Sequence, residues 1–303
     1  MKRFLAIILA GLMLLSLAAC GGKDDVVKFG VLEGVGMEAF HTGEHDEHMK
    51  KDNVNTDKPK ERVNYGSLSS ALMDLESGKI AYVVVEASTA NYVAAHNDKI
   101  VATEIVNNSI KANFSMMTME NNKEVFDILN NAIKAMKEDG TLATLVENEL
   151  KAYINSDPTP KDLPHFDGAR TIKVGVTGDM PPMDFVAANG KAAGFNIALL
   201  TEIANRAQVN IELVQIETGA RAMALSSGKV DAVFWTKNTE CSKCGSVAAE
   251  TIEGTLVTDS YFSDYAARIE LKDKKQSQHR IAGDVYASPV IKQMSMKFRG
   301  KRQ

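Results

Sequence analysis

Two groups of side chains in this sequence have the type and spacing for redox or metal chemistry. Cys241 and Cys244 are spaced Cys-x-x-Cys, and a single such pair outside the cytoplasm favours a local disulfide over a zinc site. The flanking residues also lack the context of a thioredoxin-like redox pair. A second group combines histidines with acidic neighbours, which is typical either of a divalent-metal site or of a solvated loop. Its histidines are His41, His45 and His48.

An acidic residue and the only tryptophan each follow a run of apolar residues. Glu86 comes directly after an apolar stretch that ends at Val85. A carboxylate is costly to bury, so Glu86 lies at a strand end or is paired with another group. Trp235 stands where a second apolar stretch leaves the core. It is either the wall of a binding pocket or a residue packed under a loop.

The elements that must position these residues occur twice in the chain. Residues 71–85 and 224–235 both indicate a helix that ends at Ser-Gly-Lys and is followed by a short apolar strand. Strands this apolar are buried on both faces of a sheet. The two copies predict two lobes built to one plan. The βα alternation around them predicts an α/β fold with mainly parallel sheets and flanking helices.

Periodicity and composition divide the chain into segments. The apolar positions of residues 122–153 predict a helical hairpin interrupted at Asp139-Gly140. The prolines Pro158, Pro160 and Pro164 indicate a semi-rigid linker. We therefore expect a signal segment at 1–20, an α/β lobe at 27–110, the hairpin at 111–155, the linker at 156–169, a second α/β lobe at 170–271, and a basic, disordered or lipid-associated tail at 272–303.

The N-terminus predicts export. Lys2 and Arg3 precede an apolar stretch from Phe4 to Leu17, which is the layout of a secretory signal. Leu17-Ala18-Ala19-Cys20 resembles the lipobox of bacterial lipoproteins, in which the cysteine is acylated. Acyl chains on Cys20 would hold the protein at the outer face of the cell membrane. The alternative is an ordinary cleaved signal with a chance cysteine.

Charge and hydropathy exclude some classes of protein. The net charge of -4 is unremarkable, and only the C-terminal tail is clearly basic, so we expect no nucleic-acid partner. After the signal segment, no stretch reaches the roughly 18 apolar residues of a membrane span. The 303 residues, 45% of them hydrophobic, suffice for one large or two modest domains.

Several motifs together resemble the amino-acid type (family 3) of type II extracellular solute-binding proteins. The segments that match the opening of that family's lobe 1 are Ile172 to Val176, Met180-Pro181-Pro182-Met183, Gly190 to Phe195 and Ser227-Gly228-Lys229-Val230-Asp231. The segments that resemble its lobe 2 and closing hairpin are Lys28 to Gly34, Ser77 to Glu86, and Lys137 to Leu142. Asp259-Ser260-Tyr261-Phe262 resembles the segment before the family's crossover strand.

The resemblance implies a two-lobed protein that captures a small polar solute, such as an amino acid, between its lobes. The family's second half comes first in this chain, so we interpret the order as a circular permutation. Two incomplete copies in tandem are the alternative. The implied partners are the small-molecule ligand, the permease of an ABC importer and, through Cys20, the membrane. We expect a monomer with no cofactor and no enzymatic activity.

The same resemblance implies a set of ligand-binding residues. Glu86 stands where the family has an aspartate that holds the ligand's ammonium group. The family's carboxylate-binding arginine is absent, and Cys241 to Cys244 occupy its stretch, so Lys237 or Arg221 would have to supply the positive charge. The predicted ligand-binding residues are Glu86, Gly36, Asp179, Met180, Trp235, Thr236, Asn238 and Arg221.

Two other functions remain open from the sequence. A divalent-metal-binding lipoprotein would use His41, His45 and His48. The second function is that of an enzyme similar to the dehydratases that share this fold. The sequence, however, shows no nucleophile–base pair and no group of residues arranged for acid–base catalysis.

Overall fold

The computed structural model describes residues 26–33, 60–104, 110–156, 159–242, 247–248 and 252–272. Several predictions lie outside these ranges, namely those on the signal segment with Cys20, Gly36, His41, His45, His48, Cys244 and the tail after residue 272. For Thr236, Lys237 and Cys241 only the backbone is described.

The first lobe, which we define as residues 27–104, is built on parallel strands. β1 (Val27–Leu32) lies between β2 (Lys60–Tyr65) and β3 (Tyr82–Glu86) and is parallel to both. β3 is buried along its whole length, as its apolar sequence predicts. The other elements of this lobe are α3 (Leu68–Glu76), α4 (Ala87–His96) and β4 (Ile100–Glu104).

The second lobe, defined as residues 110–261, repeats this parallel plan. β6 (Thr171–Val176) lies between β10 (Asn210–Gln215) and β11 (Ala232–Cys241) and is parallel to both. The helices α7 (Phe195–Ala207) and α8 (Arg221–Ser226) connect these strands. A small antiparallel sheet follows β6 and consists of β7 (Asp179–Met180), β8 (Asp184–Val186) and β9 (Ala192–Ala193).

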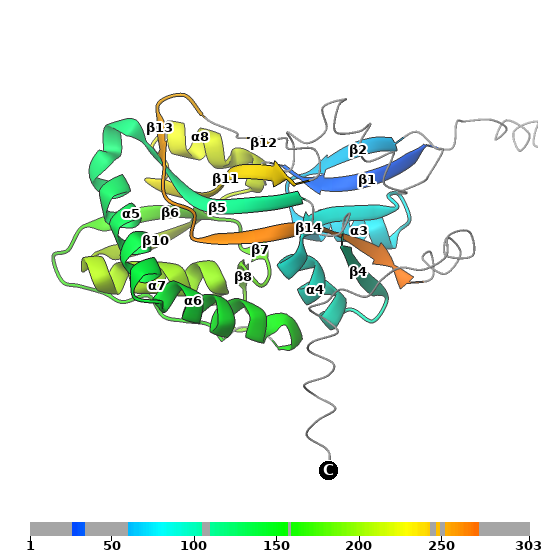
Figure 1. Cartoon of the computed structure of the whole chain (residues 1–303), viewed down its shortest axis with the longest axis horizontal. Coiled ribbons are helices and arrows are strands. Elements are labelled where there is room, and N and C mark those ends of the chain that lie inside the picture. The colour runs from blue at the N-terminus through cyan, green and yellow to red at the C-terminus, as the bar shows by residue number, and fades with distance from the viewer. Residues whose placement is uncertain are drawn as a thin grey trace, which may run out of the picture.

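Two long strands join the lobes (Figure 1). β5 (Ile110–Met119) follows the first lobe in the chain and pairs with β11 in the second. β14 (Phe262–Leu271) pairs with β5 through Tyr265 and, from Ala266 onward, with β3 and β4 of the first lobe. The strand order is therefore β10-β6-β11-β5-β14-β3-β1-β2, with β4 beside β14, β12 (Val247–Ala248) beside β11 and β13 (Thr255–Val257) beside β5.

These connections refine two predictions. The α/β class with flanking helices is confirmed, but the sheet is mixed, because every pairing made by β5 and β14 is antiparallel. Residues 111–119, which we assigned to the helical hairpin, belong instead to β5. Hydrophobic residues such as Phe114, Met116 and Met117 are buried in this strand, and their pattern does not by itself separate a strand from a helix.

The hairpin itself begins after β5. α5 (Lys123–Glu138) buries Val125, Leu129, Ile133 and Met136, as the apolar periodicity predicts. Gly140 adopts a left-handed conformation with φ 80° and separates α5 from α6 (Thr141–Val146). Both helices contact α7 of the second lobe. A π-helical segment (Glu147–Lys151) and 3-10 turns at Glu120–Asn122, Ala152–Asn155 and Thr218–Ala220 complete the elements.

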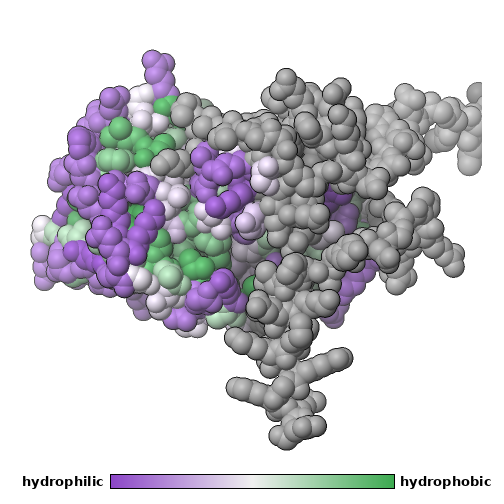
Figure 2. Space-filling view, in the orientation of Figure 1, coloured by the Kyte–Doolittle hydropathy of each residue, from purple (hydrophilic) through white to green (hydrophobic). Residues whose placement is uncertain are grey.

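One hydrophobic core cluster contains residues of both lobes, including Leu32 and Val83 from the first and Ile172 and Phe195 from the second. On the face shown in Figure 2, hydrophilic residues dominate the coloured surface and hydrophobic residues form separate patches. Among the described residues, no helix has the length and apolar character needed to cross a membrane.

Candidate ligand-binding site

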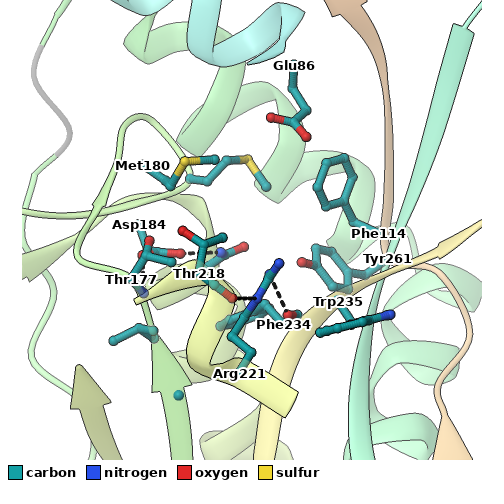
Figure 3. Close-up of a pocket in the computed structure, with 14 residues that line it drawn as sticks. Glu86, Phe114, Thr177, Met180, Asp184, Thr218, Arg221, Phe234, Trp235 and Tyr261 are labelled. Atoms are coloured by element: carbon teal, nitrogen blue, oxygen red, sulfur yellow. Dashed lines mark hydrogen bonds between the residues drawn. The ribbon is translucent and has the colours of Figure 1, made fainter. Parts of the chain in front are cut away.

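A small cavity lies where the two lobes meet (Figure 3). Its volume is about 40 Å³, which is enough for a few water molecules. The first lobe contributes Glu86, and the second lobe contributes the other lining residues. These are Phe114, Gly175, Val176, Thr177, Met180, Met183, Asp184, Asn196, Thr218, Arg221, Phe234, Trp235 and Tyr261.

Glu86 brings a buried carboxyl group to this cavity. It is the last residue of β3 and directly precedes α4, and its exposed fraction is 2%. Neither carboxyl oxygen has a hydrogen-bond partner within the described part of the chain. Burial raises the pKa of Glu86 to about 8, and the negative charge of Asp264 adds to this shift, whereas its own backbone amide and the guanidinium of Arg221 oppose it. At neutral pH the carboxyl group of Glu86 is therefore mostly protonated.

Arg221 faces Glu86 from the other lobe (Figure 3). It is the first residue of α8 and is buried. Its Nε donates to the carbonyl of Thr218 at 3.0 Å, and its Nη1 donates to the carbonyl of Phe234 at 2.9 Å. The guanidinium also lies over the ring of Trp235, 5.0 Å from the centroid. These contacts fix a positive charge at the wall of the cavity.

Asp184 organises the polar wall formed by the loop after β6. Its Oδ1 accepts hydrogen bonds from the amide and hydroxyl of Thr177 and from the amide of Gly178 at 2.9, 2.5 and 2.7 Å. Its Oδ2 accepts from Nδ2 of Asn196 at 2.8 Å. This last bond turns the amide oxygen of Asn196 away from Asp184, and that oxygen has no partner among the described residues.

Aromatic rings form much of the remaining wall. Tyr261 packs edge-on against Phe234 with ring centroids 5.9 Å apart, and Phe114 stacks on Phe262 at 5.8 Å. The hydroxyl of Tyr261 is buried without a hydrogen-bond partner in the described structure, and burial raises its pKa well above the usual value. The cavity thus combines apolar walls with acceptor oxygens on Glu86, Asn196 and Tyr261.

The structure brings four of the predicted ligand residues to this cavity and places two others elsewhere. Glu86, Met180, Trp235 and Arg221 line it. Asp179 instead bonds to Ser69 of the first lobe. Asn238 accepts a hydrogen bond from Asn113 on the neighbouring strand β5.

Strand geometry explains these two exceptions. Asp179 directly precedes Met180 in β7, and successive side chains of a strand point to opposite faces, so only one of the two can face the cavity. Asn238 follows a register irregularity in β11 between Thr236 and Asn238. Such an irregularity turns the strand and redirects its side chains.

Sequence reasoning missed several cavity residues, of which Asp184, Asn196 and Tyr261 are the clearest. A usable signal existed for each. Asp184 and Asn196 flank the turn and helix start that carry the family resemblance, and Tyr261 lies in the segment before β14. Their side-chain contacts with one another, however, depend on the fold. No group of histidines, cysteines and acids suitable for a metal ion occurs in the described residues.

Comparison with known proteins gives a partial family match. Residues 172–244 match the family model of bacterial extracellular solute-binding proteins, family 3. No curated protein matches the sequence.

Solved structures show low-scoring likenesses. The ligand-binding component of an ABC-type import system from Staphylococcus aureus, solved with zinc bound, has a TM-score of 0.46 and 11% identity, covering 84% of this chain and 68% of that one. The GluR0 ligand-binding core in complex with L-glutamate has a TM-score of 0.39 and 11% identity, covering 83% and 87%. CbnR, a LysR-family transcriptional regulator, has a TM-score of 0.41 and 10% identity, covering 93% and 78%. The family model alone confirms the sequence resemblance to family 3 of the bacterial extracellular solute-binding proteins, over residues 172–244.

Proposed function

We propose that this protein is the substrate-binding lipoprotein of an ABC importer and captures a small zwitterionic solute, an amino acid or a similar molecule. The observation that supports this most directly is the pairing of Glu86 and Arg221 across one cavity. An acid from one lobe and a guanidinium from the other complement a ligand that carries both an ammonium and a carboxylate group.

The ammonium group of such a ligand would lie near Glu86. The carboxyl oxygens of Glu86, with the oxygens of Asn196 and Tyr261, offer acceptors that no described protein group satisfies. A buried acceptor without a partner is costly, and the N–H groups of an ammonium would remove this cost. Because the pKa of Glu86 is about 8, binding of a cationic group beside it would release a proton at neutral pH.

The carboxylate would face Arg221. Two N–H groups of this side chain donate to the carbonyls of Thr218 and Phe234, which holds the guanidinium plane in position. Arg221 would thus supply the positive charge of the arginine that the family has in the stretch occupied here by Cys241 to Cys244. Trp235 packs against this guanidinium, so its fluorescence would change when a ligand binds.

Capture would follow from closure of the lobes. A ligand that touches Glu86 and Arg221 makes both contacts only when the lobes are together, so binding shifts the population toward the closed form. We propose that an ABC permease recognises this closed form and that Cys20 carries the lipid anchor on the outer face of the membrane. The order of the segments, with β14 returning to the first lobe, supports the interpretation of a circularly permuted chain.

The experiment is a thermal-shift and tryptophan-fluorescence screen of the purified protein. The probes are the proteinogenic amino acids, small organic acids, small amines and zinc chloride. The sequence contains a single tryptophan, so its emission reports on Trp235 alone. We expect an amino acid or a closely related zwitterion to raise the melting temperature and to change this emission.

Variants of the two charged residues then locate the binding site. Glu86→Gln and Arg221→Met should each weaken binding by about 10-fold or more, which corresponds to one lost charge-assisted contact. Asp127→Asn on the exposed surface of α5 is the matched control and should bind like the wild type. A hit with unchanged affinity in both cavity variants would refute the proposed site. A response to zinc alone would favour the metal-binding function instead.

A further inference from the structure

A second depression lies beside the cavity at the outer edge of the junction between the lobes. Its volume is about 640 Å³. The first lobe contributes the segment from Gly66 to Ser69, and the second lobe contributes residues 177–180, Val186 and residues 215–218. Thr177, Met180 and Thr218 line both this depression and the cavity. The contacts made here between the lobes therefore lie directly beside the candidate binding site.

Asp179 makes the most specific of these contacts. Its Oδ2 accepts a hydrogen bond from the backbone amide of Ser69 at 3.0 Å, and its Oδ1 accepts one from the hydroxyl of the same serine at 2.6 Å. Ser69 is the second residue of α3, and Ser67 at the N-cap uses its side chain for the amide of Ser70. Asp179 thus satisfies an amide in the first turn that has no acceptor within the helix. A carboxylate is also favoured electrostatically at a helix N-terminus.

A second hydrogen bond crosses the junction nearby. The hydroxyl of Thr218 donates to the carbonyl of Gly66 at 2.9 Å. Glycines allow the two lobes to approach closely at this point. A Cβ atom on Gly66 would lie 3.3 Å from a carboxyl oxygen of Glu217, and a Cβ atom on Gly219 would lie 2.3 Å from a carboxyl oxygen of Glu33. Each glycine therefore faces an acidic side chain of the opposite lobe.

We propose that Asp179 is a latch that holds the lobes closed without a ligand and thereby positions Met180 as a wall of the cavity. Every contact in this set joins the first lobe to the second, so separation of the lobes breaks all of them together. Asp179 and Met180 are adjacent in β7, so the bond from Asp179 to α3 fixes the strand that carries Met180. The resemblance had suggested that Asp179 binds the ligand; in the latch, it binds the other lobe.

The latch has a consequence for binding that does not depend on which ligand the cavity accepts. A protein that is partly closed before the ligand arrives loses less free energy on closing, and its apparent affinity is higher. Removing the latch would shift the empty protein toward an open form while leaving Glu86 and Arg221 in place.

The test uses the full-length protein in the absence of ligand. Hydrogen–deuterium exchange at the amide of Ser69 reports the latch directly, because this amide is the donor to Asp179. We expect Asp179→Ala to raise its exchange rate by about threefold or more, since loss of the acceptor opens local structure. Small-angle X-ray scattering of the same variant should show a larger radius of gyration than the wild type.

A control variant makes the result decisive. Asp127→Ala, an exposed acid on α5 paired with Lys123, is the control with the same change of charge and should leave both measurements unchanged. If Asp179→Ala shows faster exchange at Ser69 but an unchanged radius of gyration, then Asp179 only caps helix α3, and the proposed latch is refuted. Unchanged exchange and an unchanged radius in that variant would also overturn it. None of these outcomes depends on the identity of the solute.

Discussion

Glu86 and Arg221 line the same cavity although each is buried in a different lobe (Figure 3). The carboxyl group ends strand β3, and the guanidinium begins helix α8. The repeated helix–strand unit of the sequence thus contributes one charged residue from each copy. Glu86 is the last residue of the strand in the first copy, and Arg221 is the first residue of the helix in the second. The proposed binding of a zwitterionic solute rests on this placement of an acid and a guanidinium at one cavity.

The stability of the protein should depend on pH through Glu86. Its pKa is about 8 when folded and near 4.5 when unfolded, so the folded state holds the proton more tightly. The free energy of unfolding should therefore fall as the pH rises from about 5 to about 9, by an amount on the order of a few kcal/mol.

Chemical denaturation at pH 5 and pH 9 checks this dependence. Glu86→Gln removes the titrating group, so the variant should lose much of the slope and exceed the wild type in stability at pH 9. Asp264, whose pKa burial also raises, contributes a slope of the same sign, which remains in both proteins. Parallel curves for the wild type and Glu86→Gln would show that Glu86 does not titrate in this range.

Asp184 should be essential for the polar wall of the cavity. Its carboxylate accepts four hydrogen bonds, from two groups of Thr177, from Gly178 and from Asn196. Asp184→Ala leaves these donors without a buried acceptor and should lower the free energy of unfolding by about 2–5 kcal/mol. Urea denaturation measures the loss. The matched control is Asp162→Ala, which removes only an exposed ion pair with Lys191 and should change stability by less than about 0.5 kcal/mol.

Arg221→Lys should change the environment of Trp235. A lysine cannot reproduce two guanidinium hydrogen bonds to the carbonyls of Thr218 and Phe234 while remaining over the indole ring. We expect a loss of about 1–3 kcal/mol in the free energy of unfolding and a shift in the emission of the only tryptophan. Arg206→Lys, which affects a guanidinium between Asp139 and Glu202 on the surface, should leave the emission unchanged.

The strand β5 should be as important to the core as the parallel strands. Met117 in β5 is fully buried and clusters with Ile216 and Trp235, whereas Met223 in α8 is 75% exposed. Met117→Ala should cost about 2–5 kcal/mol of unfolding free energy, and Met223→Ala should cost less than about 0.5 kcal/mol. Thermal and urea unfolding of the two variants would compare the same chemical change at a buried and an exposed position. Equal costs would contradict the position of β5 in the core.

The sequence by itself determined the α/β class, the repeated helix–strand unit, the helices of residues 123–146 and the buried strand that ends at Glu86. These features depend on apolar periodicity and on glycine positions, which are local properties of the chain. Glu86, Met180, Trp235 and Arg221 could be named as candidates for the same reason, since each stands at the end or start of a recognisable element.

Only the tertiary structure decided which of these residues meet. Residues 111–119 are a strand because β11 and β14 pair with them on either side. The sequence of an apolar segment does not show which distant strands will pair with it. Asp179 bonds to Ser69, and Asp184 bonds to Asn196, because strand pairing turns their carboxylates in those directions. Contacts between segments far apart in the chain depend on how the lobes pack, and this packing free energy belongs to the whole fold and not to any short stretch of sequence.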